Sequence, residues 1–134
     1  MHAVRRTLPP VVSLLLLAAI FSLAPSIAGA AEQAVVTVTM GDDLRFSPAV
    51  VTIKPGTRVR WINRSFIRHT VTADPAKAAR PVDVALPKGA KPFDSGFIDN
   101  KATYEHVFTV AGRYRYFCIP HETTGMVAEI IVKK

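Results

Sequence analysis

Short runs in which apolar and polar residues alternate, separated by turn-forming residues, constrain the fold of this chain more than any other feature. In residues 57–62, Val59 and Trp61 alternate with arginines directly after a Lys-Pro-Gly turn signal. An apolar residue at every second position is typical of a strand with one buried face. From residue 34 onward, no stretch keeps a helical period of apolar positions over three turns. The sequence therefore predicts an all-β fold.

The candidate strands are numerous enough for two layers. The same pattern predicts short strands at residues 35–40, 49–53, 57–62, 69–72, 93–98, 103–110, 113–118 and 127–132. About seven or eight short strands of this kind indicate a two-sheet sandwich. Residues 74–92, which hold four prolines, are predicted as a long surface loop with room for a short helical turn or an edge strand.

The first thirty residues have the pattern of an export signal. Basic residues precede an apolar run at residues 11–23, and an Ala-Gly-Ala cleavage pattern ends at Ala30. The run is shorter than the roughly 20 residues that span a bilayer. We predict a signal peptide at residues 1–30 and a single periplasmic domain at residues 31–134, without membrane insertion after cleavage. An arginine pair near the start leaves both the general and the twin-arginine export routes open.

Charge narrows the range of partners. The whole chain has a net charge of +7, and removal of the predicted signal peptide, which holds two arginines and no acidic residue, leaves +5. The basic residues are spread along the chain, and no RNA- or DNA-binding motif is present, so we expect no nucleic-acid partner. The charge either steers the protein toward an acidic partner or serves solubility alone.

The chain has one cysteine, Cys118, so an exported form has no internal disulfide. An intermolecular disulfide, an inert buried thiol and a metal ligand are the three interpretations. Strand alternation puts Cys118 on the same inward face as Tyr114 and Tyr116, at the end of the predicted strand. The residues that follow Cys118 in the sequence distinguish between these three interpretations.

Two further metal-binding side chains follow the cysteine closely. Cys118, His121 and Met126 lie within nine residues of one another, in a loop between two predicted strands. A thiolate with nitrogen ligands suits copper, and a thioether is a typical weak axial ligand of copper but an uncommon ligand of zinc. His69, at the start of a predicted strand, supplies a second nitrogen. The sequence therefore predicts a copper site.

A single methionine or histidine is usually structural unless other metal-binding side chains accompany it. Met40 and His106 have no matching spacing, and we interpret both as structural. For His69 and Met126 the joint occurrence with a cysteine and a second histidine favours metal binding.

The stretch from residue 111 to 121, with the Gly-Met-Val that follows at residues 125–127, resembles the C-terminal copper loop of plastocyanins and pseudoazurins. Residues 59–63 and 69–71 resemble the region of the first copper ligand in amicyanin and related cupredoxins. The resemblance covers nearly all of residues 31–134. It implies a Greek-key β-sandwich that binds one type 1 copper ion.

The resemblance also implies the role of each site residue. It makes His69, Cys118 and His121 the strong copper ligands and Met126 the weak axial one. Copper in such proteins shuttles between Cu(I) and Cu(II), and the ring of the loop histidine, here His121, is the usual exit for the electron toward a partner protein.

Some residues depart from the family pattern. Arg68 and Thr70 flank the first histidine, where many relatives have Pro or Asn, and Glu122 is unusual near a docking surface that we expect to be mostly apolar. Pro120 has no N–H and donates no backbone hydrogen bond to the Cys118 sulfur. We expect the thiolate to be electron-rich for that reason.

Two functions share this ligand set: electron carrier between redox partners, which we favour, and copper delivery without a role in a redox chain. Copper oxidases and reductases need a further copper centre with several more histidines. Only His106 remains after residue 30 once His69 and His121 are assigned, so we expect no enzymatic activity. A monomer is the default expectation for oligomeric state.

Overall fold

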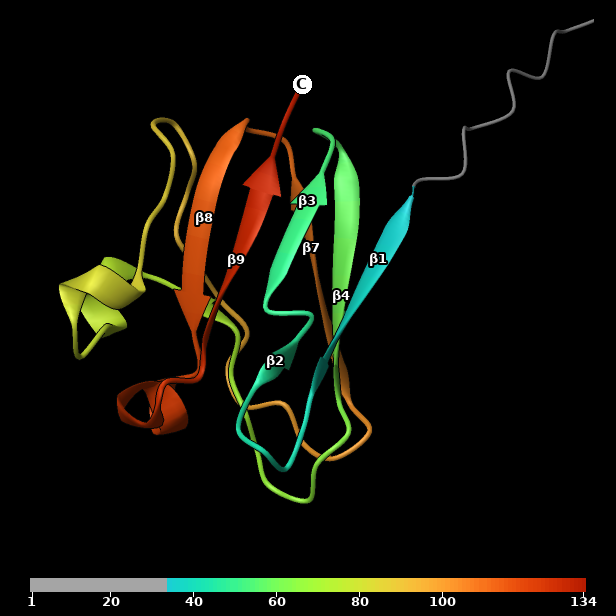
Figure 1. Cartoon of the computed structure of the whole chain (residues 1–134), viewed down its shortest axis with the longest axis vertical. Coiled ribbons are helices and arrows are strands. Elements are labelled where there is room, and N and C mark those ends of the chain that lie inside the picture. Colours follow the sequence, from blue (N-terminus) through green and yellow to red (C-terminus); the bar gives the residue numbers. More distant parts are fainter. Residues whose placement is uncertain (1–33) are drawn as a thin grey trace, which may run out of the picture. The chain divides into compact units, whose positions relative to one another are not determined.

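A computed structural model describes residues 34–134, which form two β-sheets that pack face to face (Figure 1). The predicted signal peptide, residues 1–30, and its cleavage site at Ala30 lie outside the described residues. No helix of the described part is long and apolar enough to cross a membrane.

The first sheet has the strand order β2-β1-β4-β7. Strand β1 pairs in parallel with β4 along its whole length, and β4 pairs antiparallel with β7. The four strands are β1 (Val35–Met40), β2 (Phe46–Ser47), β4 (Thr57–Asn63) and β7 (Thr103–Phe108).

The second sheet has the order β3-β9-β8-β5-β6. Strand β3 runs parallel to β9, whereas the other neighbours are antiparallel. The five strands are β3 (Val50–Ile53), β5 (Thr72–Ala73), β6 (Phe93–Asp94), β8 (Gly112–Phe117) and β9 (Val127–Val132).

The predicted all-β Greek-key sandwich is confirmed, with nine strands among the described residues instead of seven or eight. Strands β1 and β9 have the predicted bounds. Strand β2 is new, because a two-residue strand leaves no alternation to detect. The predicted strands at residues 69–72 and 93–98 are each reduced to two residues, and beyond them only His69 and Ile98 pair, as an isolated bridge.

The core lies between the sheets and centres on Trp61 of β4, which is fully buried. Its indole N–H donates to the hydroxyl of Tyr116 on the opposite sheet over 3.1 Å, and its ring also contacts Tyr104 and Phe108. Tyr116 and Cys118 are fully buried as well, which confirms the predicted inward face of β8.

The proline-rich segment after β5 contains two 3-10 turns, η1 (Pro75–Lys77) and η2 (Pro81–Asp83). Buried Asp83 forms ion pairs with Arg80 and Arg115, and Ala85 pairs with Arg115 of β8 as an isolated bridge. The predicted loop therefore contains short helical turns, whereas the alternative of an edge strand is limited to the single bridge at Ala85.

Candidate metal centre

The loop from β8 to β9 carries three of the four predicted ligands. Cys118 directly follows β8, η3 (Ile119–Thr124) comes next, and Met126 directly precedes β9. The amide of Cys118 donates to the carbonyl of Met126, and the amide of Met126 donates to that of His121, each over 3.1 Å. Gly125 ends η3 at φ +89°, a conformation that glycine adopts at little cost. These contacts hold the loop in a compact turn.

His69 comes from a distant part of the chain, between β4 and β5. Its backbone pairs with that of Ile98 over 3.3 and 2.8 Å. Its ring Nε2 lies 2.8 Å from Ser65 Oγ, which lies 2.8 Å from Asn63 Oδ1. Both of these hydrogen bonds form when His69 Nε2–H donates to the Ser65 hydroxyl and that hydroxyl donates to Asn63 Oδ1. That arrangement leaves the lone pair of His69 on Nδ1, free to bind a metal.

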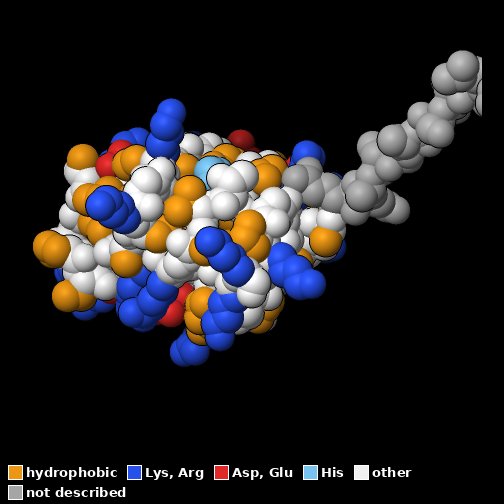
Figure 2. Space-filling view, turned by 90° about the horizontal axis from the view of Figure 1, so that it is seen from above, with side chains coloured by type: hydrophobic (Ala, Val, Ile, Leu, Met, Phe, Trp, Pro, Cys, Tyr) orange, Lys and Arg blue, Asp and Glu red, His pale blue; other side chains and the backbone are white. Residues whose placement is uncertain are grey.

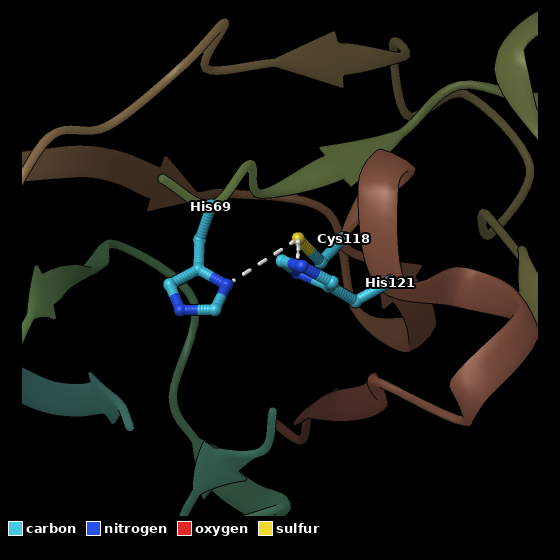
Figure 3. Close-up of side chains that lie close together, drawn as sticks. All are labelled: His69, Cys118 and His121. Carbon is cyan, nitrogen blue, oxygen red and sulfur yellow. Dashed lines mark hydrogen bonds between the residues drawn. The ribbon is translucent and has the colours of Figure 1, made fainter. Parts of the chain in front are cut away.

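The rings of His69 and His121 both turn toward the sulfur of Cys118 (Figure 3). The Nδ1 atoms lie 3.6 Å and 3.4 Å from Sγ, respectively. All three candidate donor atoms lie within 4.8 Å of one another. Donors bound to one ion at about 2.0–2.3 Å lie up to about 4.5 Å apart, so this spacing is close to what a single ion requires.

Thr70 braces the cysteine from the neighbouring segment. Its backbone N–H donates to Cys118 Sγ over 3.3 Å, and its hydroxyl accepts from the amide of Ile119 over 2.8 Å. Burial raises the pKa of the Cys118 thiol, and hydrogen bonds to the thiol from Thr70 and from the backbone of His121 offset part of the effect. A metal ion that replaces the thiol proton relieves the cost of burying a thiolate.

Burial also favours the metal-binding form of both histidines. It lowers the pKa of His69, where the charge of His121 acts in the same direction and nearby Asp42 and Asp43 oppose it. Burial likewise lowers the pKa of His121. The neutral imidazole is therefore favoured, which is the form that binds a metal ion.

Met126 is fully buried in the same core cluster as Cys118. It occupies the closing position of the loop, where its backbone contacts both Cys118 and His121. Its role as a weak axial ligand stays a prediction.

His106 lies on β7, away from the three donors, and stacks on Phe93 with ring centroids 4.3 Å apart. The cluster found among the described residues contains His69, Cys118 and His121 but not His106. Packing against an aromatic ring agrees with the structural interpretation of this histidine.

Replacing His106 with glutamine is expected to make the free energy of unfolding less dependent on pH. Burial lowers the pKa of His106 in the folded protein, so the unfolded chain takes up more protons as the pH falls. This contribution to stability is complete above a pH of about 6.5 and is lost as the pH falls toward the lower pKa of the folded state. Urea unfolding of both copper-free proteins at pH values of about 5 and 7.5 measures it; the same pH dependence in both would contradict the prediction.

The sequence pattern predicted the three side chains that the structure brings together, but it missed the side chains that hold them. Ser65 and Asn63 orient His69, and Thr70 braces Cys118. None of these has a spacing that distinguishes it from an ordinary turn residue. Glu122, expected near a docking surface, is buried, with 2% of its surface exposed.

The donor set suits copper. One thiolate and two imidazoles form the soft and intermediate ligand combination typical of copper electron-transfer sites. The neutral imidazoles, the buried sulfur and the oriented Nδ1 atom of His69 all fit such an ion.

Comparison with known proteins agrees with this chemistry. The sequence profile of the copper binding proteins of the plastocyanin/azurin family matches residues 32–133. The chain is 36% identical over 103 residues to the chloroplastic plastocyanin of Tetradesmus obliquus, covering 72% of this chain and 66% of that protein. It is 34% identical over 100 residues to the plastocyanin of Nostoc punctiforme, covering 72% of each.

Solved structures support the fold. An oxidized amicyanin mutant superimposes with a TM-score of 0.57 at 22% identity, covering 73% of this chain and 81% of that one. A purple cupredoxin from Nitrosopumilus maritimus gives a TM-score of 0.57 at 21% identity, covering 73% of this chain and 99% of that one. One type 1 copper ion is the cofactor of the plastocyanin group, and the His-Cys-His cluster described above matches it. The chain therefore belongs to the plastocyanin/azurin family of copper-binding proteins and is a cupredoxin.

Proposed function

We propose that this protein carries single electrons between redox partners outside the cytoplasm. In this proposal His69, Cys118 and His121 are the strong ligands of one type 1 copper ion, and Met126 is the weak axial ligand. The observation that carries the proposal is the convergence of three donor side chains, from two distant segments, on one buried point. The bound copper supplies the reversible one-electron change.

The protein contributes a scaffold that resists rearrangement. His69 is fixed through Ser65, Cys118 is fixed through Thr70, and the ligand loop is closed by its own backbone hydrogen bonds. Donors held in this way move little when the charge at the site changes, so little rearrangement opposes electron transfer.

We further propose His121 as the exit for the electron. Its side chain is only partly buried, whereas His69 and Cys118 are fully buried. The exposed apolar side chains of Phe66 and Ile119 come from the same two segments as the donors. They favour an apolar contact surface for a partner protein near His121.

A redox protein with acidic groups is the partner that we propose. Lys and Arg side chains are spread over the face seen in Figure 2, where Asp and Glu are few. Such a surface attracts an acidic protein at long range. We propose that the protein acts as a monomer and has no enzymatic activity of its own.

The proposed mature form is a single domain of residues 31–134, exported to the periplasm by a signal peptide at residues 1–30. The family match supports this division, since it begins at residue 32, just after the proposed cleavage site at Ala30.

Copper delivery is the competing function. Whether the protein retains its copper in the presence of an acceptor distinguishes delivery from electron transfer. We expect the copper-loaded protein to keep nearly all of its metal when mixed with an equimolar copper-free acceptor that exposes two cysteines. We also expect repeated chemical reduction and reoxidation without loss of metal. The buried sulfur and the braced loop slow copper release. Metal analysis after size separation measures retention; transfer of most of the copper within minutes would favour delivery.

A further inference from the structure

The buried carboxylate of Glu122 has no role in the site described so far. Glu122 lies in η3 directly after His121, with 2% of its surface exposed. Its Oε2 atom accepts a hydrogen bond from the backbone N–H of Ala79, and its Oε1 atom accepts one from that of Arg80, each over 2.8 Å. The residue thus links the ligand loop to the segment between η1 and η2 (Figure 1).

These contacts are long-range. The two amides are 43 and 42 positions from Glu122 in sequence. The carboxylate accepts from the amides of two consecutive residues, the second of which, Arg80, is the N-cap of η2. Burying a carboxylate is costly unless it is hydrogen-bonded, and two charge-assisted bonds to backbone amides offset that cost.

The segment that Glu122 contacts is itself fixed to the second sheet. Lys77 of η1 pairs with Asp94 of β6, and Asp83 of η2 pairs with Arg115 of β8. The ligand loop is therefore braced at two points: by Thr70 beside the cysteine and by Glu122 beside the loop histidine.

We propose that Glu122 is a positioning residue of the metal centre. By anchoring η3 to the segment between η1 and η2, it fixes the backbone that carries His121. The inference rests on the proposed copper-binding role of His121. It makes the proline-rich segment part of the scaffold of the centre.

Three variants test this role in the full chain. Glu122→Gln keeps the size of the side chain but removes the charge and turns an amide donor toward one of the backbone N–H groups. Glu122→Ala removes both hydrogen bonds. Glu105→Gln is the matched control, because it removes the charge of another carboxylate with two partners, Arg58 and Arg60, and Glu105 lies on β7, outside the ligand loop and the segment that Glu122 contacts.

The copper-free protein gives the first measurement, amide hydrogen exchange. In Glu122→Ala the amides of Ala79 and Arg80 lose protection, and so do those of His121 and Met126, which hydrogen-bond within the ligand loop. In Glu105→Gln the ligand-loop amides exchange as in the wild type. Unchanged exchange at His121 in Glu122→Ala would overturn the positioning role.

The copper-loaded protein gives the second measurement. We expect Glu122→Ala to bind copper roughly 10-fold more weakly, at the low end of the 10- to 100-fold loss found for residues that support metal ligands. In both Glu122 variants the reduction potential shifts, because the backbone that carries His121 is held less firmly to the amides of Ala79 and Arg80. The electron paramagnetic resonance spectrum of Cu(II) shifts as well. Glu105→Gln leaves potential and spectrum unchanged, because the partners of Glu105, Arg58 and Arg60, lie on β4 and not in the ligand loop.

The results that would contradict the role of Glu122 differ from those that would contradict the proposed function. Equal potentials and spectra in the wild type and in both Glu122 variants, or the same shifts in Glu105→Gln, would overturn the proposal. If Glu122→Ala does not fold, Glu122→Gln carries the test. A wild-type protein that shows no type 1 copper spectrum at all would contradict the proposed function instead, while the exchange measurement would still report on the Glu122 anchor.

Discussion

Cys118→Ser is expected to abolish the intense visible absorption of the copper-loaded protein. That colour arises from charge transfer between a thiolate and Cu(II), and serine supplies no thiolate. Cys118 is the single cysteine of the chain, so no other sulfur of this type replaces it. The variant should also bind copper more than about 100-fold more weakly, because loss of a mere supporting residue already costs 10- to 100-fold.

Absorption spectra after addition of Cu(II) measure this effect, and circular dichroism checks that the sandwich remains folded. His69→Gln should also lose or strongly alter the absorption, since its Nδ1 faces the sulfur. His106→Gln is the matched control and should keep the colour, because His106 lies outside the cluster. A blue or green Cys118→Ser protein, or a colourless wild type, would contradict the assignment.

Trp61→Ala should lower the free energy of unfolding more than any other substitution proposed for this protein. Truncation of a fully buried tryptophan costs about 3–5 kcal/mol in lost burial and in the cavity that remains. The indole also donates to the buried hydroxyl of Tyr116, which loses its partner in the variant. A domain of this size is stable by about 5–15 kcal/mol in total, so the variant is expected to be close to unfolding. Urea denaturation of the copper-free protein measures the loss.

Trp61→Phe serves as the control for that variant. It keeps most of the ring contacts with Tyr104, Phe108 and Tyr116 but removes the N–H donor. The expected loss is smaller, about 1–3 kcal/mol. A loss below about 1 kcal/mol for the alanine variant would show that the sandwich does not depend on this residue.

The long strands were predictable because their side chains alternate between the core and the surface. In β4 the alternation of Val59 and Trp61 with arginines determines both the strand and its buried face. The short strands were not predictable in the same way. Beyond β6, Gly96 adopts φ +63°, which interrupts the ladder, so that Ile98 pairs with His69 only as a bridge. Sequence alternation does not report such a break.

The candidate metal-binding side chains were easier to predict from the sequence than the residues that hold them in place. Cysteine, histidine and methionine have characteristic chemistry, and the spacing of Cys118, His121 and Met126 suits a loop. Supporting residues are common polar types whose partners lie far away in sequence. Glu122 contacts amides more than forty positions away, so only the folded chain reveals that this carboxylate is buried.

The position of the donors has a consequence for folding. His69 and Cys118 are separated by 49 positions, and both face one point in the structure. An ion bound there joins the two segments and closes a long loop of the chain, as a disulfide would. It also stabilises the folded state by mass action, since the unfolded chain does not hold the donors together. Copper held by the proposed ligands would thus act as the cross-link that a chain with one cysteine does not otherwise form.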